Sequence, residues 1–96
     1  MTLTLTQKAA ERLQRIRWRQ KAQGFVRIKM EKSSGTQWIF QMGFDVEREG
    51  DEKTESQGVT LVMDRTTARA LDGTTVDFEE IEGKGIFSFK KTSAPD

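Results

Sequence analysis

Apolar side chains near the start of the chain recur with the spacing of a helix. The pattern over residues 6–23 predicts an amphipathic helix, because three apolar side chains share one face at about 100° per residue: Ala9, Leu13 and Ile16. Thr6 or Thr4 can cap the N-terminus through a hydroxyl that accepts a backbone N–H, and Gly24 is a typical C-terminal stop. We expect the apolar face of this helix to meet the core.

Strict alternation of apolar and polar side chains then predicts two strands. In residues 25–31 one face is apolar, with Val26, Ile28 and Met30, and the opposite face is polar, with Arg27, Lys29 and Glu31. The alternation is longest over residues 37–46. Its apolar face is expected to build the core and comprises Trp38, Phe40, Met42, Phe44 and Val46.

Shorter elements are expected in the second half of the chain. Further strands are predicted at residues 59–63, 75–78 and 86–89. Asp64 can cap a short helical turn that closes at Asp72-Gly73. Residues 47–58 contain no apolar side chain and are predicted to be a charged loop, while residues 90–96 are predicted to fray.

Together these elements predict a mainly β fold. One long helix, about five short strands and one helical turn are typical of a sandwich or small barrel rather than of a parallel sheet. No internal repeat or linker divides the chain, so we expect one domain over residues 1–96.

The composition excludes several kinds of chemistry. The chain has no cysteine and no histidine, and it has no tyrosine either. Disulfides, thiolate metal sites and thiol catalysis are therefore excluded for these residues, and the commonest general base is missing. No apolar run is long enough to span a membrane, and residues 1–6 do not resemble a secretory signal, so a cytoplasmic protein is expected.

Charge is divided unevenly between the two halves of the chain. Residues 1–44 carry nine Lys/Arg and two Asp/Glu, a net +7, and residues 45–96 carry seven and thirteen, a net −6. Such asymmetry can mark a polar binding surface. The alternative that we favour is that the two halves neutralise each other in the fold.

Four stretches of the sequence together resemble one known family. They are the start, Leu3-Thr4-Leu5-Thr6 with Lys8-Ala9-Ala10-Glu11-Arg12; the strand Val26-Arg27-Ile28 with Ser33-Ser34-Gly35; Gly58-Val59-Thr60-Leu61-Val62-Met63-Asp64; and Leu71-Asp72-Gly73-Thr74-Thr75-Val76-Asp77-Phe78, followed by Phe87-Ser88-Phe89. In this order and spacing they resemble the HesB/IscA family of A-type iron–sulfur carriers. The resemblance implies a β pseudo-barrel or sandwich with an N-terminal helix, and a place in iron–sulfur cluster assembly.

The chain departs from that family at its cluster ligands. The family places one cysteine before Ser-Gly, and here that position is Ser33. It places two more in a C-terminal Cys-Gly-Cys, whereas the sequence here reads Lys91-Thr92-Ser93-Ala94-Pro95-Asp96. Soft thiolates hold such clusters, and a serine hydroxyl keeps its proton at neutral pH. The resemblance therefore predicts no cofactor and no metal-binding residue for this chain. The missing ligands fit either natural divergence or an altered or truncated carrier. The residues Glu31-Lys32, which stand where the family has a glycine-rich segment, favour natural divergence.

Residues of the predicted helix are the candidate partner-binding residues. Arg12, Arg15 and Arg19, with Lys8, form a basic stripe, and Trp18 falls nearly opposite the apolar face. Tryptophan is enriched in interface hot spots, so Trp18 could face water or a partner. Alternatively, it lies along the edge of the sheet or covers the helix end. The near-zero net charge and the lack of a nucleic-acid motif argue against a nucleic-acid partner.

Other polar groups are more simply structural. Ser33-Ser34-Gly35 could bind an anion or a partner through backbone N–H groups, but it also suits an ordinary turn. The carboxylates of Asp64, Asp72 and Asp77 could hold a hard cation, but cap, turn and strand-edge roles are favoured.

The leading hypothesis is a non-enzymatic accessory scaffold related to iron–sulfur cluster assembly, which acts by binding a protein partner or by self-association. One alternative is a metal or cluster carrier with non-cysteine or partner-supplied ligands. A second alternative is a structural or interaction subunit unrelated to iron–sulfur chemistry. A small enzyme is disfavoured, because without cysteine, histidine or tyrosine it would have to rely on Asp/Glu, Lys or Ser side chains.

Overall fold

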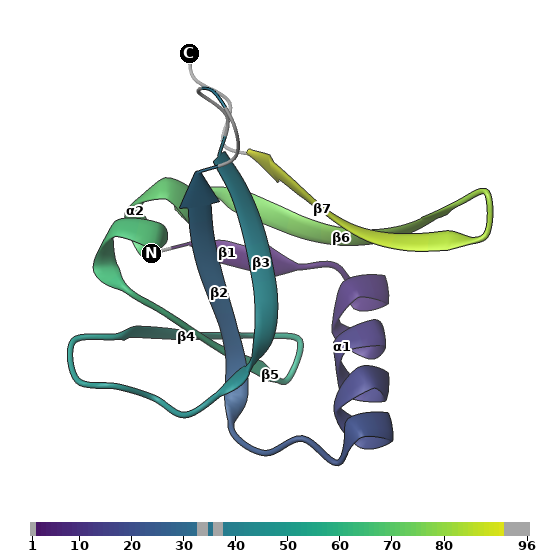
Figure 1. Cartoon of the computed structure of the whole chain (residues 1–96), viewed down its shortest axis with the longest axis horizontal. Helices are drawn as coiled ribbons and strands as arrows, with labels where there is room; N and C mark the ends of the chain where they lie inside the picture. The colour runs from purple at the N-terminus through teal and green to yellow at the C-terminus, as the bar shows by residue number, and fades with distance from the viewer. Residues whose placement is uncertain (1, 33–34, 36–37, 92–96) are drawn as a thin grey trace.

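The computed structural model describes residues 2–32, 35 and 38–91, and it shows a mainly β fold with two helices (Figure 1). The elements in chain order are β1 Leu3–Leu5, α1 Gln7–Gln20, β2 Phe25–Lys32, β3 Trp38–Asp45, β4 Glu52–Ser56, β5 Val59–Met63, α2 Arg65–Leu71, β6 Thr74–Ile81 and β7 Lys84–Lys91. The predicted fold class is confirmed.

The described strands form two separate mixed sheets rather than one closed barrel. One sheet has the order β1-β6-β7 and the other β3-β2-β5-β4. The β1–β6 and β2–β5 pairs are parallel, and the β2–β3, β4–β5 and β6–β7 pairs are antiparallel. On one side the sheets meet where the backbone N–H of Leu5 donates to Ser56 Oγ at 2.9 Å. On the other, the rings of Phe40 and Phe89 lie 5.0 Å apart.

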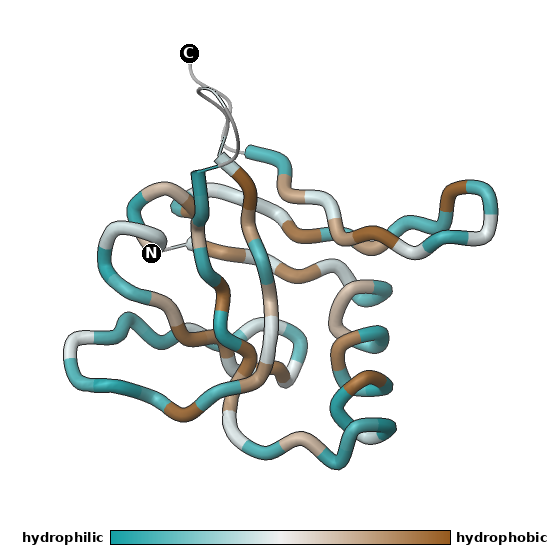
Figure 2. The backbone as a smooth tube through the Cα atoms, viewed as in Figure 1, coloured by the Kyte–Doolittle hydropathy of each residue, from teal (hydrophilic) through white to brown (hydrophobic). Residues whose placement is uncertain are grey.

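The core lies between the sheets and beneath α1. Its fully buried side chains come from β1, β2, β5, β6 and both helices, and the largest are Leu5, Ile28, Leu61, Met63 and Leu71. Figure 2 shows strongly hydrophobic positions along β1 and a mixture of hydrophobic and polar positions along α1. The face of α1 that packs on the core is small, because it consists of Ala9, Ala10 and Leu13.

Both helices begin where the sequence provides a cap. The side chain of Thr6, not Thr4, accepts the backbone N–H of Ala9 at 3.1 Å, and Asp64 accepts that of Thr67 at 2.7 Å. The prediction for the end of α1 was wrong. The helix stops at Gln20, with Lys21 in a left-handed conformation, before Gly24 is reached. Gly24 is needed for another reason, because a Cβ there would meet the backbone carbonyl of Asp45.

A buried ion network fixes β2 to β3 and to the segment that leads into β4. The side chain of Arg27 is only 7% exposed and that of Asp51 only 5%. The Arg27 guanidinium donates to Asp45 Oδ2 at 2.8 Å, to the Val46 carbonyl at 2.8 Å and to both carboxylate oxygens of Asp51. The hydrogen bonds that Asp51 accepts, first from the Arg27 side chain and then from the backbone N–H of Arg48, lower the pKa of Asp51. The alternation in sequence places Arg27 on the polar face of its strand. Lys29 and Glu31 on that face are exposed, but Arg27 is buried.

Several other sequence-based expectations are corrected by the structure. Residues 52–56 form strand β4 instead of lying in a loop, and the short strand β1 was not predicted. Seven strands are present among the described residues, against about five expected. Trp38 is 55% exposed and Val46 64%, so the two ends of the long alternating segment lie outside the core.

Candidate functional site

Helix α1 carries the candidate partner-binding residues: Lys8, Arg15, Trp18 and Arg19 are exposed, and Arg12 is half-buried. The helix packs through its alanine-rich side, so the opposite side is left to solvent. Trp18 is 84% exposed, which makes it the most exposed large hydrophobic side chain among the described residues. It therefore faces solvent and does not lie along the sheet edge.

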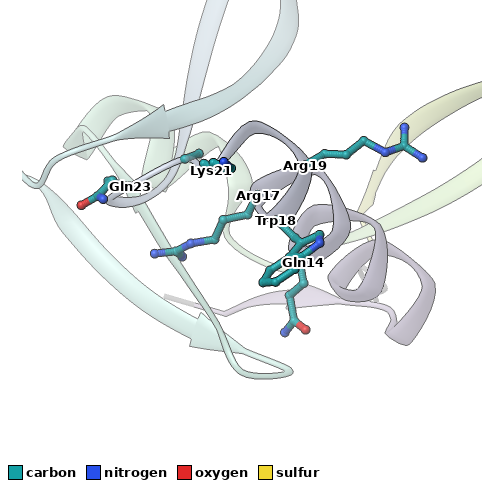
Figure 3. Close-up of a pocket in the computed structure, with 7 residues that line it drawn as sticks. Gln14, Arg17, Trp18, Arg19, Lys21 and Gln23 are labelled. Atoms are coloured by element: carbon teal, nitrogen blue, oxygen red, sulfur yellow. The ribbon is translucent and has the colours of Figure 1, made fainter.

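A broad hollow of about 720 Å³ surrounds Trp18 at the C-terminal end of α1. It is lined by Gln14, Arg17, Trp18, Arg19, Lys21, Ala22 and Gln23. Figure 3 shows Gln14 beside the Trp18 indole, with Arg17 and Arg19 extending to opposite sides of the helix. The site thus joins one exposed aromatic ring to three cations. Arg17 and Lys21 were missed by the sequence analysis, although their proximity to Trp18 along the chain could have suggested them.

A second hollow, of about 400 Å³, lies between α1 and β6. It is lined by Lys8, Glu11, Arg12, Arg15, Phe78 and Glu80. The guanidinium carbon of Arg12 lies 5.1 Å from the centroid of the Phe78 ring, which is within cation–π range. The predicted basic stripe is therefore divided, because Arg12 and Arg15 line this hollow whereas Arg19 lines the one at Trp18.

A third, apolar groove of about 300 Å³ opens where α1 meets the facing edges of the two sheets. It is lined by Leu13, Ile16, Phe40, Met42, Gly43, Phe44, Ile86, Phe87 and Phe89. The sequence pattern placed Phe40, Met42 and Phe44 in the core, and they do pack against it while remaining partly buried. The groove exists because β3 and β7 are both edge strands.

Several other candidates have structural roles or lie beyond what the structure shows. Ser33, the position of the family cysteine, lies outside the described residues. Asp64 caps α2, and Asp72 accepts the backbone N–H of Thr2 at 2.7 Å. Asp77 accepts the Thr6 hydroxyl at 2.7 Å, and this hydrogen bond is the main reason that the pKa of Asp77 is lowered. The cap at Asp64 and the turn position of Asp72 are as expected, whereas Asp77 lies within the central strand β6 and not at a strand edge.

The donor set of the chain does not suit an iron–sulfur cluster. Cluster iron is held by thiolates, and none of the 96 residues is a cysteine. Across residues 2–32, 35 and 38–91, no three carboxylates are grouped as metal ligands would be. In the same ranges, no helix is long and apolar enough to cross a membrane.

The charge asymmetry of the sequence is only partly neutralised in the fold. Arg27, from the basic half, is paired with Asp45 and Asp51 from the acidic half. The ion pairs Lys53–Glu47 and Lys90–Glu79 both lie within the acidic half. The cations on the outer face of α1 form no ion pair with the described residues, so this face remains basic.

Comparisons with known proteins give a consistent result. A family model described as iron-sulphur cluster biosynthesis matches residues 1–95. A crystal structure of IscA with the 2Fe–2S cluster is similar, with 26% identity, a TM-score of 0.76, and coverage of 97% of this chain and 85% of that one. A crystal structure of Escherichia coli SufA, a protein described as involved in biosynthesis of iron–sulfur clusters, is also similar. It has 26% identity, a TM-score of 0.77, and coverage of 98% of this chain and 89% of that one.

A solution structure of a protein from Aquifex aeolicus is also similar. It has 27% identity, a TM-score of 0.68, and coverage of 90% of this chain and 87% of that one. No curated protein matches the chain.

Proposed function

Because the chain belongs to the iron-sulphur cluster biosynthesis family, we propose that it serves that process as a non-enzymatic accessory protein in the cytoplasm. In this role it binds a protein partner and does not hold a cluster with its own side chains. The partner that best fits the family is a cysteine-bearing carrier similar to IscA or SufA.

The observation that carries this proposal is the position of Trp18. An indole left almost fully in water has no part in the packing of this chain, so its apolar surface is available to a partner. Tryptophan and arginine are the residues most enriched in binding hot spots, and Arg17 and Arg19 line the same hollow. The complete lack of cysteine supports the other half of the proposal, namely that the cluster itself is held elsewhere.

Titration of the protein with a purified, cysteine-bearing carrier of this family tests the proposed surface. We expect Trp18→Ala to weaken binding at least tenfold, because loss of a hot-spot tryptophan typically costs about 2 kcal/mol or more. The matched control is Trp38→Ala, which removes the other exposed tryptophan, on β3 and away from α1. Equal affinities for wild type and Trp18→Ala would exclude this surface, and no binding of the carrier would exclude the proposed partner.

A second candidate function is that of a carrier that shares a cluster with thiolates from its partner. The similarity to an IscA structure that contains a 2Fe–2S cluster favours it. Iron and sulfide analysis of the anaerobically purified protein, alone and after mixing with a cluster donor, distinguishes the two. For an accessory protein we expect neither element to stay with the isolated chain. Bound iron and sulfide with visible charge-transfer bands would instead establish a carrier.

A further inference from the structure

The hollow between α1 and β6 gathers five charged side chains around one aromatic ring. Lys8, Arg12 and Arg15 come from successive turns of α1, and Glu11 lies on the same helix. Glu80 and Phe78 come from one face of β6, because they are two residues apart in a strand. The site is therefore built by two elements that are distant in sequence and are held together by the core.

Arg12 is held in place within this hollow, but its Nε has no acceptor among the described residues. Its guanidinium lies over Phe78, and its Nε is buried without a hydrogen-bond partner among the described residues. Arg12 and Arg15 form no ion pair in that part of the chain. A guanidinium that is partly dehydrated and already oriented by a ring loses less entropy when it binds a carboxylate.

The two carboxylates of the hollow form no ion pair with these cations among the described residues. Glu11 accepts a hydrogen bond from Gln7 at 3.2 Å, and Glu80 is exposed. Lys8 also acts on Asp77, since its charge contributes to the lowered pKa of that group. Arg12 and Arg15 are thus the cations most available to a ligand, and the formal charge of the five lining side chains is +1, from three cations and two carboxylates.

We propose that this hollow receives a carboxylate side chain, from an aspartate or glutamate on the surface of a protein partner, with Arg12 as its main donor. A single carboxylate matches a net charge of +1, whereas a phosphate dianion exceeds it. Glu11 and Glu80 would in addition repel the successive phosphates of a nucleic acid. The guanidinium fork can give a carboxylate two parallel hydrogen bonds.

This inference rests on the proposed function, because it assigns part of the same partner's footprint. Arg12 and Trp18 are six residues apart on α1, or about 9 Å along the helix axis at 1.5 Å per residue. A partner of ordinary interface size can therefore cover both hollows. The Trp18 hollow would supply apolar contact, and the Arg12 hollow a charged contact that sets the orientation.

The test uses a capped tri-glutamate peptide, its tri-glutamine counterpart and inorganic phosphate as probes, with amide and arginine Nε–H shifts followed by NMR. We expect the glutamate peptide to shift Arg12, Arg15 and Phe78, and Arg12→Gln to weaken its binding at least fivefold. The matched control is Arg65→Gln, which removes the same charge from an exposed position on α2, outside both hollows. Glu80→Gln alters an exposed rim residue and is expected to tighten binding, which keeps the test decisive if Arg12→Gln disturbs folding.

Equal binding of the two peptides, shifts located elsewhere, or tighter binding of phosphate than of the glutamate peptide would each overturn the inference. Its failure can be told apart from that of the proposed function. If the carrier binds in a Trp18-dependent way while the peptide does not reach the hollow, only the carboxylate site is lost. If the peptide binds and the carrier does not, the proposed partner is lost and the carboxylate site stands.

Discussion

Replacement of Asp51 by asparagine tests whether the buried ion network holds this fold together. Asp51 accepts hydrogen bonds from Arg27 through both carboxylate oxygens, and the backbone N–H of Arg48 donates to Oδ2 at 2.7 Å. An asparagine side chain has the same shape as aspartate, but its amide has only one acceptor oxygen. Its NH₂ group would face N–H donors of Arg27 or Arg48, which it cannot bind. The buried Arg27 guanidinium then keeps Asp45 as its one carboxylate partner among the described residues.

The expected loss is about 3 kcal/mol in the free energy of unfolding. Removing one partner of a buried ion pair typically costs about 3–5 kcal/mol, and the remaining bonds to Arg27 place this case at the lower end. In a chain of this size, that corresponds to a fall of about 15 °C in the melting temperature. The matched control is Glu47→Gln. Its ion pair with Lys53 at 3.2 Å is half-exposed, so a change of about 0.5 kcal/mol or less is expected.

Urea unfolding followed by far-UV circular dichroism measures both variants, since the exposed Trp18 and Trp38 make fluorescence a poor probe of the core. The fold lowers the pKa of Asp51. The ionised Asp51 side chain therefore stabilises the fold fully at any pH above the pKa of a carboxylate in the unfolded chain. This stabilisation is lost as the pH falls through the lowered pKa of the folded state. The difference in the free energy of unfolding between wild type and Asp51→Asn should be constant near neutral pH and should become smaller below about pH 4. A loss no larger than that of Glu47→Gln at neutral pH would refute the reasoning.

Substitutions at three further positions test local features of the fold. Gly24→Ala should destabilise the protein by about 2 kcal/mol, because the new Cβ meets the Asp45 carbonyl at a positive φ of 91°. Gly50→Ala, at a φ of 87° but in open space, isolates the backbone strain and should cost about 1 kcal/mol in the same unfolding assay. Thr6→Ala should cost about 1 kcal/mol, since it removes the cap of α1 and the hydrogen bond to Asp77. Thr6→Ser, which keeps the hydroxyl, should restore most of this loss, and equal losses in both variants would contradict the capping role.

The sequence by itself determined the regular elements that carry their own apolar period. The helix of residues 7–20 and the strands β2, β3 and β5 lie close to where the periodicity placed them. The caps at Thr6 and Asp64 were also readable, because capping needs only residues that are neighbours in the chain. The lack of cysteine and histidine likewise excludes whole classes of chemistry by composition alone, however the chain folds.

The sequence did not reveal elements whose stability comes from a partner strand. Strand β4 is charged and has no apolar period, yet it pairs with β5 from Glu52 to Ser56 as an edge strand. Arg27 read as a solvent-facing strand residue because its partners, Asp45 and Asp51, follow 18 and 24 residues later. Trp38 and Val46 continued the alternation beyond the part of the sheet that the core covers.

The candidate site, too, was predictable from the sequence only in part. The basic stripe of the helix and the position of Trp18 away from the apolar face were both predictable, since they follow from about 100° per residue. Only the tertiary structure separated Arg12 and Arg15 from Arg19. That separation depends on Phe78 and Glu80, which β6 brings against α1 from more than 60 residues away. Periodicity orients side chains within one element, whereas a binding site depends on which other element packs beside it.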